Sequence, residues 1–418
     1  MQPLRGTKDI LPNETYIWQY IYEIAEKILS LSNYKEIRTP IIENTSLFTR
    51  SIGDDTDIIN KEMYTFEDQG KRKITLRPEG TASIARAFIS NKLYIDKKVQ
   101  RLWYYGPMFR YERPQYGRQR QFHQLGIECI GSLSPIADIE VIRLAIKILN
   151  ILNCSKYTLE INSIGNLEER NIYKEKLIDY LTQYKEDLDE DSKKRLYNNP
   201  LRILDSKNSK TQEILLEAPQ LQSYLNSESI KHFHEICDHL QYLNIHYNIN
   251  TKLVRGLDYY NYTAFEIKTK ELNNQNTICG GGRYDKLIEQ LGGPNTPSVG
   301  WAIGLERLLL IIQNNLNLKN QELDIYIAIK GYEAQQKIWN IIEILEEYNI
   351  RFELNLNQNN LQKQLKKANQ LGAKICLIMA ENEIINQYIT IKYLKTGRQE
   401  IIKINNLRTY LYSLKSSL

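Results

Sequence analysis

Cysteine is scarce in this chain, and no two cysteines are close together in the sequence. The 418 residues include 5 of them, at Cys129, Cys154, Cys237, Cys279 and Cys376. An odd number without any CxxC pair fits neither a zinc ribbon nor a disulfide framework. These scattered thiols therefore indicate a reducing compartment.

The chain also lacks long apolar runs, a strong net charge and a targeting segment. No apolar run approaches the roughly 20 residues that a membrane span requires, and the start, MQPLRGTKDILPNE, has neither an apolar signal core nor an Arg- and Ser-rich leader. A formal net charge of +5 does not by itself indicate nucleic acid. We expect a soluble protein that works where it is made. The abundance of Ile, Asn, Lys and Tyr suggests an AT-rich genome, which favours the plastid (chloroplast) stroma if the gene is organellar and a bacterial cytoplasm otherwise.

The length of the chain allows two or three domains, each with its own core. Strand and helix patterns predict an α+β domain made of residues 1–165 and 251–313, interrupted by a charged helical insertion at 166–250. A polar linker at 314–322 leads to a C-terminal α/β domain at 323–418, in which strands and helices alternate. For this last domain we expect a right-handed, mostly parallel sheet.

A hairpin with a basic tip is the most informative stretch of the sequence. Its predicted strands are residues 101–111 and 121–130, and the arginines at or beside its tip are Arg110, Arg113, Arg118 and Arg120. A guanidinium group suits phosphate oxygens, although a charged turn is more often only solvated. Phe122, Gln124 and Glu128 share one face of the returning strand, because strand side chains alternate. This combination favours a pocket for an adenine, a polar substrate and a triphosphate.

Three features of the N-terminal part carry specific expectations. Asn13 is expected to cap a helix that ends at about Leu31, because isoleucines recur there at helical spacing. The stretch YKEIRTPII is predicted to be a strand, and Pro40 in it must lie at an edge or an interface, since proline donates no ladder hydrogen bond. Residues 61–77 alternate apolar and polar around a turn and predict an antiparallel hairpin.

Glu79 stands just before a helix that opens near Thr81. An acid at this place offsets the helix dipole, which is the structural interpretation. The functional interpretation is an anchor for an ammonium group. The pattern alone leaves both open.

Strand character resumes at residues 252–269, where an alternating strand would place Arg255 and Tyr259 on one face. Packing alone rarely uses an arginine, a glycine and two adjacent tyrosines in a strand, so we favour a functional role. The sequence CGGGRYD follows, and three glycines before a helix would let a ligand approach backbone N–H groups, although such a run is often only a turn. Arg307, near the start of a later helix, is either a surface residue or a nucleotide contact, and its glycine-rich approach favours the contact.

Two polar clusters are weaker signals. The insertion holds His232, His234, His239 and His246 near Cys237 and Asp238. They form no closed tetrahedral set at metal-ligand spacing, so solvated histidines are favoured and we predict no metal ligands. Lysines gather around the second helix of the C-terminal domain at Lys363, Lys366, Lys367 and Lys374. They make a solvated face by default, and a candidate RNA surface if the first domain binds ATP.

Five stretches carry a resemblance to a known family. YKEIRTPIIE, GPMFRYERPQYGRQRQFHQLGIE and SVGWAIGLERLLL are similar to motifs 1, 2 and 3 of class II aminoacyl-tRNA synthetases, and LVRGLDYY and GGRYD are similar to two histidine-specific signatures. Over essentially its full length the chain resembles histidyl-tRNA synthetase. The resemblance implies a catalytic domain on an antiparallel sheet, an anticodon-binding C-terminal domain, and a homodimer through the motif 1 region with Pro40. Gly280 and Tyr111 depart from the family's usual Ala and His without removing a group on which these roles depend.

The resemblance implies a reaction in which ATP activates L-histidine to histidyl-adenylate, which then passes to tRNA(His) with release of AMP and pyrophosphate. Mg²⁺ would accompany ATP, and we predict no tightly bound protein metal. Arg110 and Arg255 would be catalytic, because attack of a carboxylate on phosphorus brings two anions together. Histidine would be bound by Glu79, Gly80, Thr81, Arg110, Gln124, Glu128, Arg255, Tyr259, Tyr260 and Tyr284. ATP would be bound by Arg110, Glu112, Arg118, Phe122 and Arg307, and the acceptor end of the tRNA by Arg113 and Gln115.

A binding protein is the alternative to the enzyme. The regulatory subunit of ATP phosphoribosyltransferase resembles the synthetase in fold and senses histidine. Such paralogues typically lose the signature arginines and the C-terminal domain. Arg110, Arg255 and Arg307 are present here, together with the α/β tail, so the sequence favours the enzyme.

Overall fold

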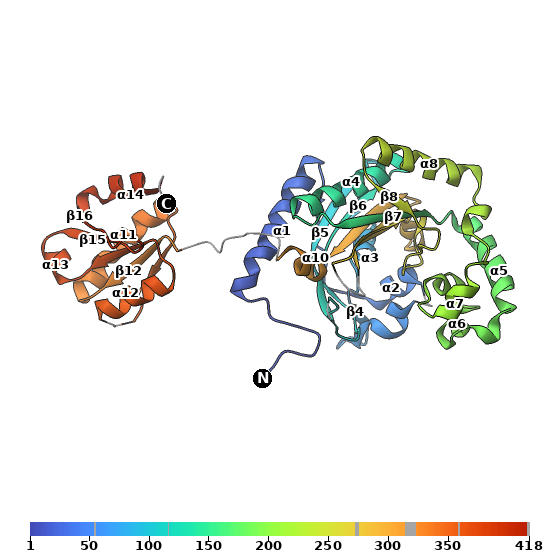
Figure 1. Ribbon diagram of the computed structural model, residues 1–418, viewed down its shortest axis with the longest axis horizontal. Helices are drawn as coiled ribbons and strands as arrows, with labels where there is room; N and C mark the ends of the chain where they lie inside the picture. Colours follow the sequence, from blue (N-terminus) through green and yellow to red (C-terminus); the bar gives the residue numbers. More distant parts are fainter. Residues whose placement is uncertain (54–55, 116, 272–275, 314–322, 358–359, 416–418) are drawn as a thin grey trace. The chain divides into compact units, whose positions relative to one another are not determined.

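The chain forms two compact units in the computed structural model, Met1–Asn317 and Leu318–Leu418. The structure describes residues 1–53, 56–115, 117–271, 276–313, 323–357 and 360–415. The predicted linker at 314–322 lies outside these ranges. Each unit is built around a sheet of its own (Figure 1). Each also has its own apolar core. Among the described residues, no helix is at once long enough and apolar enough to cross a membrane.

The first unit is built on one eight-stranded sheet. In spatial order its strands are β1 (Lys35–Glu36), β5 (Gln100–Phe109), β6 (Gln121–Ile130), β11 (Ser298–Gly304), β10 (Thr277–Arg283), β9 (Asn261–Thr269), β7 (Tyr157–Ser163) and β8 (Tyr247–Ile249). Neighbours run antiparallel except for β1 with β5 and β7 with β8. This confirms the predicted antiparallel sheet. It also sets the basic hairpin β5–β6 beside a strand from much later in the chain, with Gln124 opposite Gly304.

Helices cover both faces of the large sheet. They are α1 (Pro12–Leu31), α2 (Thr45–Ile52), α3 (Thr81–Ser90), α4 (Pro135–Ile151), α5 (Leu167–Thr182), α6 (Glu190–Arg195), α7 (Ser209–Ile214), α8 (Ser227–Tyr242), α9 (Leu287–Gln290) and α10 (Leu305–Ile312). Leu125 and Ile127 of β6 join the core made with α1, α4, α8 and α10. Because strand side chains alternate, Phe122, Gln124 and Glu128 point to the opposite face, where Phe122 packs in a cluster with Ile84 and Phe88 of α3. We call this second face the site face.

A separate three-stranded sheet tests the predictions for the N-terminal part. It consists of β2 (Ile42–Asn44), β4 (Lys73–Leu76) and β3 (Tyr64–Glu67), and β3 with β4 confirms the hairpin predicted at residues 61–77. Asn13 does not cap α1, because the helix begins at Pro12 and Leu11 takes the cap position. Proline suits a first helical position, where its missing N–H costs no hydrogen bond. Pro40 lies between β1 and β2 rather than inside a strand, which its missing N–H also explains.

Two predictions for the middle of the chain were wrong in detail. Strand β8 lies within residues 166–250, which the sequence pattern makes helical throughout, and it extends the large sheet by pairing with β7. The segment before Asn261 is irregular, so Arg255 and Tyr259 do not lie on a strand. The alternation of residues 252–269 is therefore strand-like only in its second half.

The three consecutive glycines lie inside β10, not before a helix. A Cβ on Gly281 would lie 2.3 Å from the carbonyl oxygen of Gly300, and a Cβ on Gly282 would lie 2.4 Å from that of Thr263. Neighbouring groups thus come too close to this strand for side chains. The glycines serve close packing within the sheet rather than a turn.

The second unit is a five-stranded sheet with helices on both faces. Its strands are β12 (Ile325–Ile329), β13 (Phe352–Leu354), β14 (Ile375–Met379), β15 (Tyr388–Tyr393) and β16 (Gln399–Lys403), and its helices are α11 (Tyr332–Glu347), α12 (Leu361–Gln370), α13 (Glu381–Ile385) and α14 (Leu407–Lys415). The spatial order is β13-β12-β14-β15-β16. The first three strands are parallel, as predicted, but β15 and β16 add two antiparallel pairs. The sheet is therefore mixed rather than mostly parallel.

Candidate active site

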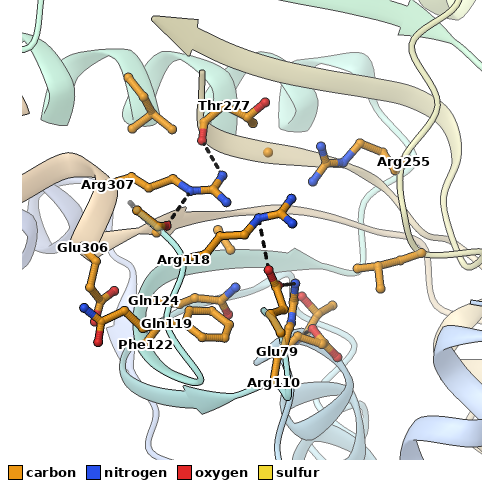
Figure 2. A pocket seen from close by; sticks show the side chains of 18 of the residues that line it. Glu79, Arg110, Arg118, Gln119, Phe122, Gln124, Arg255, Thr277, Glu306 and Arg307 are labelled. Carbon is orange, nitrogen blue, oxygen red and sulfur yellow. Dashed lines mark hydrogen bonds and ion pairs between the residues drawn. The ribbon is translucent and has the colours of Figure 1, made fainter. Parts of the chain in front are cut away.

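One cavity of about 180 Å³ opens on the site face of the first unit. The predicted residues that line it are Glu79, Thr81, Arg110, Glu112, Arg118, Phe122, Gln124, Arg255, Tyr259, Tyr260 and Arg307. They come from the start of α3, the hairpin β5–β6, the irregular segment before β9, and the start of α10. The fold thus brings together groups that the sequence keeps far apart (Figure 2).

Three guanidinium groups surround the same open space, those of Arg118, Arg255 and Arg307 (Figure 2). The Arg307 side chain is fixed by hydrogen bonds that it donates to the carbonyl oxygens of Gly117, at 3.1 Å, and Thr277, at 2.9 Å. Burial first, and then the charge of Arg118, lowers the pKa of Arg307. A cavity in which cations repel one another favours an anion, and a polyanion most of all.

Arg255 is held by a carboxylate that the sequence analysis missed. Its side chain is 17% exposed and forms an ion pair with Glu266 of β9. The second oxygen of Glu266 accepts a hydrogen bond from the Thr277 hydroxyl, at 3.0 Å. Burial by itself would lower the pKa of Arg255, but the charge of Glu266 outweighs it, so the pKa is raised. Glu266 is the one acid within β9, which by itself assigns it no role, and only the pairing of β9 with β10 sets it opposite Gly280.

Gly280 makes room for the Arg255 side chain. A Cβ at this position would lie 2.2 Å from a terminal nitrogen of the Arg255 guanidinium. The departure noted in the sequence, glycine in place of alanine, therefore lies directly beneath the arginine. It changes the space around this guanidinium rather than removing a functional group.

Arg110 and Phe122 form a flat surface on the hairpin. The Arg110 side chain donates a hydrogen bond from its Nε to the carbonyl oxygen of Pro78, at 2.8 Å. Its guanidinium carbon lies 5.2 Å from the centroid of the Phe122 ring, within the range of a cation–π contact. A planar ring with a cation beside it suits an aromatic base that carries phosphates.

The other end of the cavity is lined by groups that accept hydrogen bonds. The carboxylate of Glu79 accepts bonds from the backbone N–H groups of Thr81, at 2.6 Å, and Ala82, at 2.7 Å, which supports the structural interpretation of this acid. Each carboxylate oxygen can accept a second bond, so this role does not exclude an ammonium group. Gln124 lines the cavity too, and its buried side-chain oxygen has no hydrogen-bond partner among the described residues. A buried acceptor without a partner is the arrangement that a bound cation would complete.

Glu128 lies one layer deeper than the cavity wall. It is fully buried and accepts hydrogen bonds from the hydroxyls of Thr81, at 2.7 Å, and Tyr284. Burial, together with the charge of Glu79, raises the pKa of Glu128 to about 8, even though both hydroxyls stabilise its charged form. Gly300 leaves space for this carboxylate, since a Cβ there would lie 1.9 Å from its Oε2.

Aromatic rings close this end of the site. The rings of Tyr259 and Tyr260 are 4.6 Å apart, and Tyr284 lies 5.6 Å from Tyr259. Tyr104, which the sequence analysis missed, packs so closely on Gly80 that a Cβ there would lie 2.4 Å from its ring. The Tyr104 hydroxyl is buried without a hydrogen-bond partner in the described part of the chain. The sequence indicates the position of Tyr104 only through the alternation of β5. This alternation places Tyr104 on the same face as Met108, in the same apolar cluster.

Five predicted residues do not line the cavity: Gly80, Glu128 and Tyr284 are buried, and Arg113 and Gln115 lie at the tip of the hairpin. Arg113 is exposed. Gln115 lines a neighbouring hollow together with Lys8 and Trp18, and its backbone N–H donates to the carbonyl oxygen of Arg118, at 3.2 Å. The tip therefore offers polar groups to something larger than the ligand of the cavity.

Comparison with known proteins gives matches along the whole chain. The family model for histidyl-tRNA synthetase matches residues 6–308, and that for the anticodon binding domain matches residues 324–414. The chloroplastic histidine–tRNA ligase of Gracilaria tenuistipitata var. liui is 64% identical over 99% of this chain and 99% of its own length. The histidine–tRNA ligase of Acaryochloris marina is 51% identical over 100% of this chain and 97% of its own. The crystal structure of apo S. aureus histidyl-tRNA synthetase has a TM-score of 0.83 at 36% identity, covering 98% of this chain and 99% of that one.

Proposed function

The chain belongs to the histidyl-tRNA synthetase family, and from this premise we propose that its first unit activates L-histidine with ATP and charges tRNA(His). The observation that carries the proposal is a single cavity lined both by guanidinium groups and by the buried hydrogen-bond acceptors Glu79 and Gln124. Such a cavity fits a nucleotide triphosphate next to an amino acid. The relatives that match over the full length are ligases, which favours charging over the role of a histidine-sensing regulatory subunit.

In the first step, a carboxylate oxygen of histidine attacks the α-phosphorus of ATP. A new P–O bond forms, the bond to the β-phosphate oxygen breaks, and pyrophosphate leaves with the electron pair. Arg110 and Arg255 neutralise the charge that develops between the two anions, and Arg118 takes the outer phosphates with Glu112 as its partner, 3.1 Å away. No side-chain nucleophile is required, because positioning and charge supply the catalysis.

The adenine of ATP lies between the Phe122 ring and the Arg307 side chain. Phe122 supplies the flat apolar surface. Arg307 is anchored by the backbone carbonyls of Gly117, in the hairpin tip, and Thr277, at the start of β10. A base held between a ring and a guanidinium gains stacking on one side and a cation–π contact on the other. This arrangement fixes the α-phosphate relative to the two catalytic arginines.

Histidine is recognised at the opposite end of the cavity. Glu79 and Gln124 accept hydrogen bonds from its α-ammonium group. The backbone of Gly80 and Thr81 lies beside this group. Its imidazole lies among Tyr259, Tyr260 and Tyr284, and Glu128 accepts a hydrogen bond from the ring. An imidazole has two nitrogens, and a carboxylate with a hydroxyl can recognise both, which distinguishes histidine from amino acids of similar size.

In the second step, a terminal ribose hydroxyl of the tRNA attacks the carbonyl carbon of the adenylate, and AMP leaves. Arg113 and Gln115 at the hairpin tip receive the acceptor end. Mg²⁺ enters with the phosphates of ATP as part of the substrate. The carboxylates nearest the phosphate end, Glu112 and Glu266, are already paired with arginines, so the chain's own contribution there is positive charge.

We further propose that two copies associate through the motif 1 region. Pro40, Ile41 and Ile42 are exposed there, and the two isoleucines have 40% and 51% of their surface open to solvent. Adjacent exposed apolar side chains of this kind fit a protein interface better than a solvated surface.

Two further proposals concern the insertion and the location. Residues 166–250 act as an insertion that packs on both faces of the large sheet, because Leu177 and Leu196 belong to the apolar cluster of the site face and Ile236 of α8 belongs to the cluster of the other face. The protein works in the plastid stroma, since the relative from Gracilaria tenuistipitata var. liui is named chloroplastic.

The experiment that tests the function is ATP–pyrophosphate exchange measured with each of the twenty amino acids. We expect exchange with L-histidine alone, followed by transfer of labelled histidine to tRNA(His). Exchange with a different amino acid would contradict the assigned specificity. Histidine binding without exchange would support the regulatory alternative instead.

A further inference from the structure

The segment that carries Tyr259 and Tyr260 lies outside the strands of the large sheet. It comprises residues 255–260, and strand pairing begins only at Asn261 of β9. Both tyrosines nevertheless line the cavity. A segment outside the ladder needs other partners for its backbone groups if its side chains are to keep one position. Helix α5 of the insertion supplies such a partner.

Arg170, in the first turn of α5, reaches across to this segment. Its Nη1 donates a hydrogen bond to the backbone carbonyl oxygen of Tyr260, 90 residues further along the chain. Arg170 also lines a small hollow of about 40 Å³ together with Asp258 and Tyr260. A hydrogen bond from a charged donor is stronger than one between neutral groups. Arg170 therefore fixes the backbone at a residue whose ring faces the cavity.

The first turn of α5 is itself held in place. Asn166 and Glu169 form a capping box, in which each side chain accepts a hydrogen bond from the backbone N–H of the other, at 3.0 and 2.6 Å. The buried carboxylate of Glu169 also accepts bonds from the N–H of Asn226 and, at 2.7 Å, from the hydroxyl of Ser229, at the start of α8. Glu169 thus joins the starts of two helices, and the arginine that follows it extends from a rigid base.

Cations of the insertion also face the acidic residue of the segment. Burial raises the pKa of Asp258, while the charges of Lys174, Arg170 and Arg202 act in the opposite direction. A Cβ on Gly256 would lie 2.8 Å from a terminal nitrogen of Arg202, so this side chain packs against the segment too. The insertion thus contacts the segment at both its beginning and its end, and its charges attract the carboxylate between them.

The start of β9 depends on the same part of the insertion. Its register with β10 shifts between Gly282 and Arg283, which marks a bulge. Tyr262 lies there with a φ of 49°, in the left-handed region that a tyrosine rarely adopts. Its N–H donates to the carbonyl oxygen of Gly165, at 2.7 Å, just before the cap of α5. Bulges re-aim neighbouring side chains, so this contact supports the bend that precedes β9.

The nucleotide end of the cavity is held by other segments. Phe122 belongs to β6, and Arg307 of α10 is fixed by carbonyl groups of the hairpin tip and of β10. Arg255 begins the irregular segment but has its own ion pair with Glu266. A change in the contact from α5 should therefore displace the histidine end of the cavity and leave the nucleotide end in place.

We propose that Arg170 is a positioning residue for histidine: it holds the Tyr260 carbonyl and so keeps Tyr259 and Tyr260 around the imidazole. The inference rests on the proposed function of the cavity. Arg170 does not itself line the cavity, so it acts through the backbone rather than by touching the substrate. Through this one contact the insertion sets the affinity for the amino acid, because a small displacement of recognition groups weakens their contacts.

The test compares Arg170→Met with Lys176→Met in the full-length protein. Methionine keeps an unbranched apolar stem but has no donor. Lys176 is the matched control, because it lies on α5, is 56% exposed and pairs with Asp179 of the same helix. In pyrophosphate exchange, Arg170→Met should raise the KM for histidine about ten- to hundredfold. The KM for ATP should change less than about twofold, because the nucleotide contacts are unchanged. Arg170→Lys keeps the charge and should lie between the parent and Arg170→Met.

A purely structural role of Arg170 predicts a different result. It would reduce the fraction of active molecules, and therefore kcat, without changing either KM. That result, an equal rise in both KM values, or a KM for histidine in folded Arg170→Met no higher than in Lys176→Met would overturn the proposal. If Arg170→Met does not fold, Arg170→Lys replaces it. A point donor holds a carbonyl less firmly than a planar fork, so its KM for histidine should rise about two- to fivefold, and the parent's value would overturn the proposal.

Calorimetric titration with L-histidine in the absence of ATP separates this proposal from the proposed function. Weaker binding by Arg170→Met than by the parent and Lys176→Met would support the positioning role even in a protein that shows no exchange. Absence of histidine-dependent exchange in the parent would refute the charging function alone. Equal binding by all three proteins would overturn the positioning role and leave the charging function intact.

Discussion

The cavity of the first unit and a groove beside α11 of the second hold their functional groups in opposite ways. In the cavity, Arg255 and Arg307 are bonded to carboxylates or carbonyls before any ligand arrives. The groove has a volume of about 1090 Å³, and Tyr332 and Trp339, which line it, are more than half exposed. Phosphoryl transfer gains most from charges that are fixed in advance, because they need no reorganisation during the reaction. The second unit matches an anticodon binding domain, and recognition of a mobile RNA loop gains from flat, accessible surfaces that accept several positions of the partner.

This contrast predicts different consequences of damage. A change in the cavity should impair adenylate formation and therefore every later step. A change in the groove should impair only the reaction that involves tRNA. The same protein can thus be tested twice, once by pyrophosphate exchange and once by charging, and the pair of results locates the defect.

Arg255→Ala should have the largest effect. It removes a positive charge that we propose to lie at the α-phosphate and leaves Glu266 without the Arg255 side of its ion pair, so histidine-dependent exchange should fall on the order of a hundred- to a thousandfold or below detection. Charging should fall with it. Arg72→Ala is the control, because Arg72 lies on the exposed turn of the β3–β4 hairpin with 76% of its side chain open. Near-normal exchange by a folded Arg255→Ala protein would refute the catalytic assignment.

Removal of residues 323–418 should have a smaller effect, confined to charging. The first unit has its own cores and the whole cavity, so exchange should stay within about twofold of the parent's rate. Charging should fall roughly a hundredfold, since the anticodon contacts of the second unit are lost together. Undiminished charging would show that the second unit takes no part in tRNA recognition.

The residues of the cavity were largely predictable because their patterns are local. The alternation of β6 placed Phe122, Gln124 and Glu128 on one face, and the structure brings that face to the cavity. Arg255 and Tyr259 were predicted to share a site because an alternating strand would place them on one face. That reason was wrong, since both lie on an irregular segment. They line the cavity from the irregular segment before β9, not from an alternating strand.

The parts that could not be predicted depend on contacts between distant segments. Glu266 is identified only by the register of β9 with β10, which sets it opposite Gly280 and next to Arg255. The space requirement at Gly300 comes from Glu128 on a neighbouring strand. The groove is invisible in the sequence because Tyr332 and Trp339 look like ordinary members of an amphipathic helix. Only the order of the strands reveals that their side of α11 faces an opening.

Glu128→Gln should weaken histidine activation less than Arg255→Ala does. It should also change how the stability of the protein depends on pH. A bound imidazole N–H would favour the carboxylate form of Glu128, and an amide is a weaker acceptor than a carboxylate, so the KM for histidine in pyrophosphate exchange should rise roughly tenfold. The pKa of Glu128 is raised from 4.5 to about 8, so between these values the folded protein holds a proton that the unfolded chain has lost. The contribution of Glu128 to the stability of the parent is therefore lost as the pH rises through this window. The variant has no such proton, and its Tm relative to the parent should increase from pH 5 to pH 8.5.

The control for this pH dependence is Glu67→Gln, which removes an exposed carboxylate from β3 of the same unit. Its Tm relative to the parent should stay nearly constant over the same range. If Glu128→Gln behaves in the same flat way, Glu128 does not hold an extra proton in the folded state. An unchanged KM for histidine would remove it from the recognition of the imidazole.

The smallest effects are expected from substitutions of the lysines of α12. This helix carries both a lysine that is held in an ion pair and lysines that are exposed, so the two kinds can be compared directly. Lys367 is paired with Glu353, 2.7 Å away, whereas Lys363 and Lys366 are exposed on the same helix. A lysine that neutralises an RNA phosphate releases about one counterion, so Lys363→Ala and Lys366→Ala should each raise the KM for tRNA about twofold at low salt and reduce the salt dependence of binding. Lys367→Ala should change both less, because Glu353 already balances its charge. Charging measured from low to moderate salt checks the order, and an equal effect of all three substitutions would show that α12 attracts RNA by its total charge rather than by particular side chains.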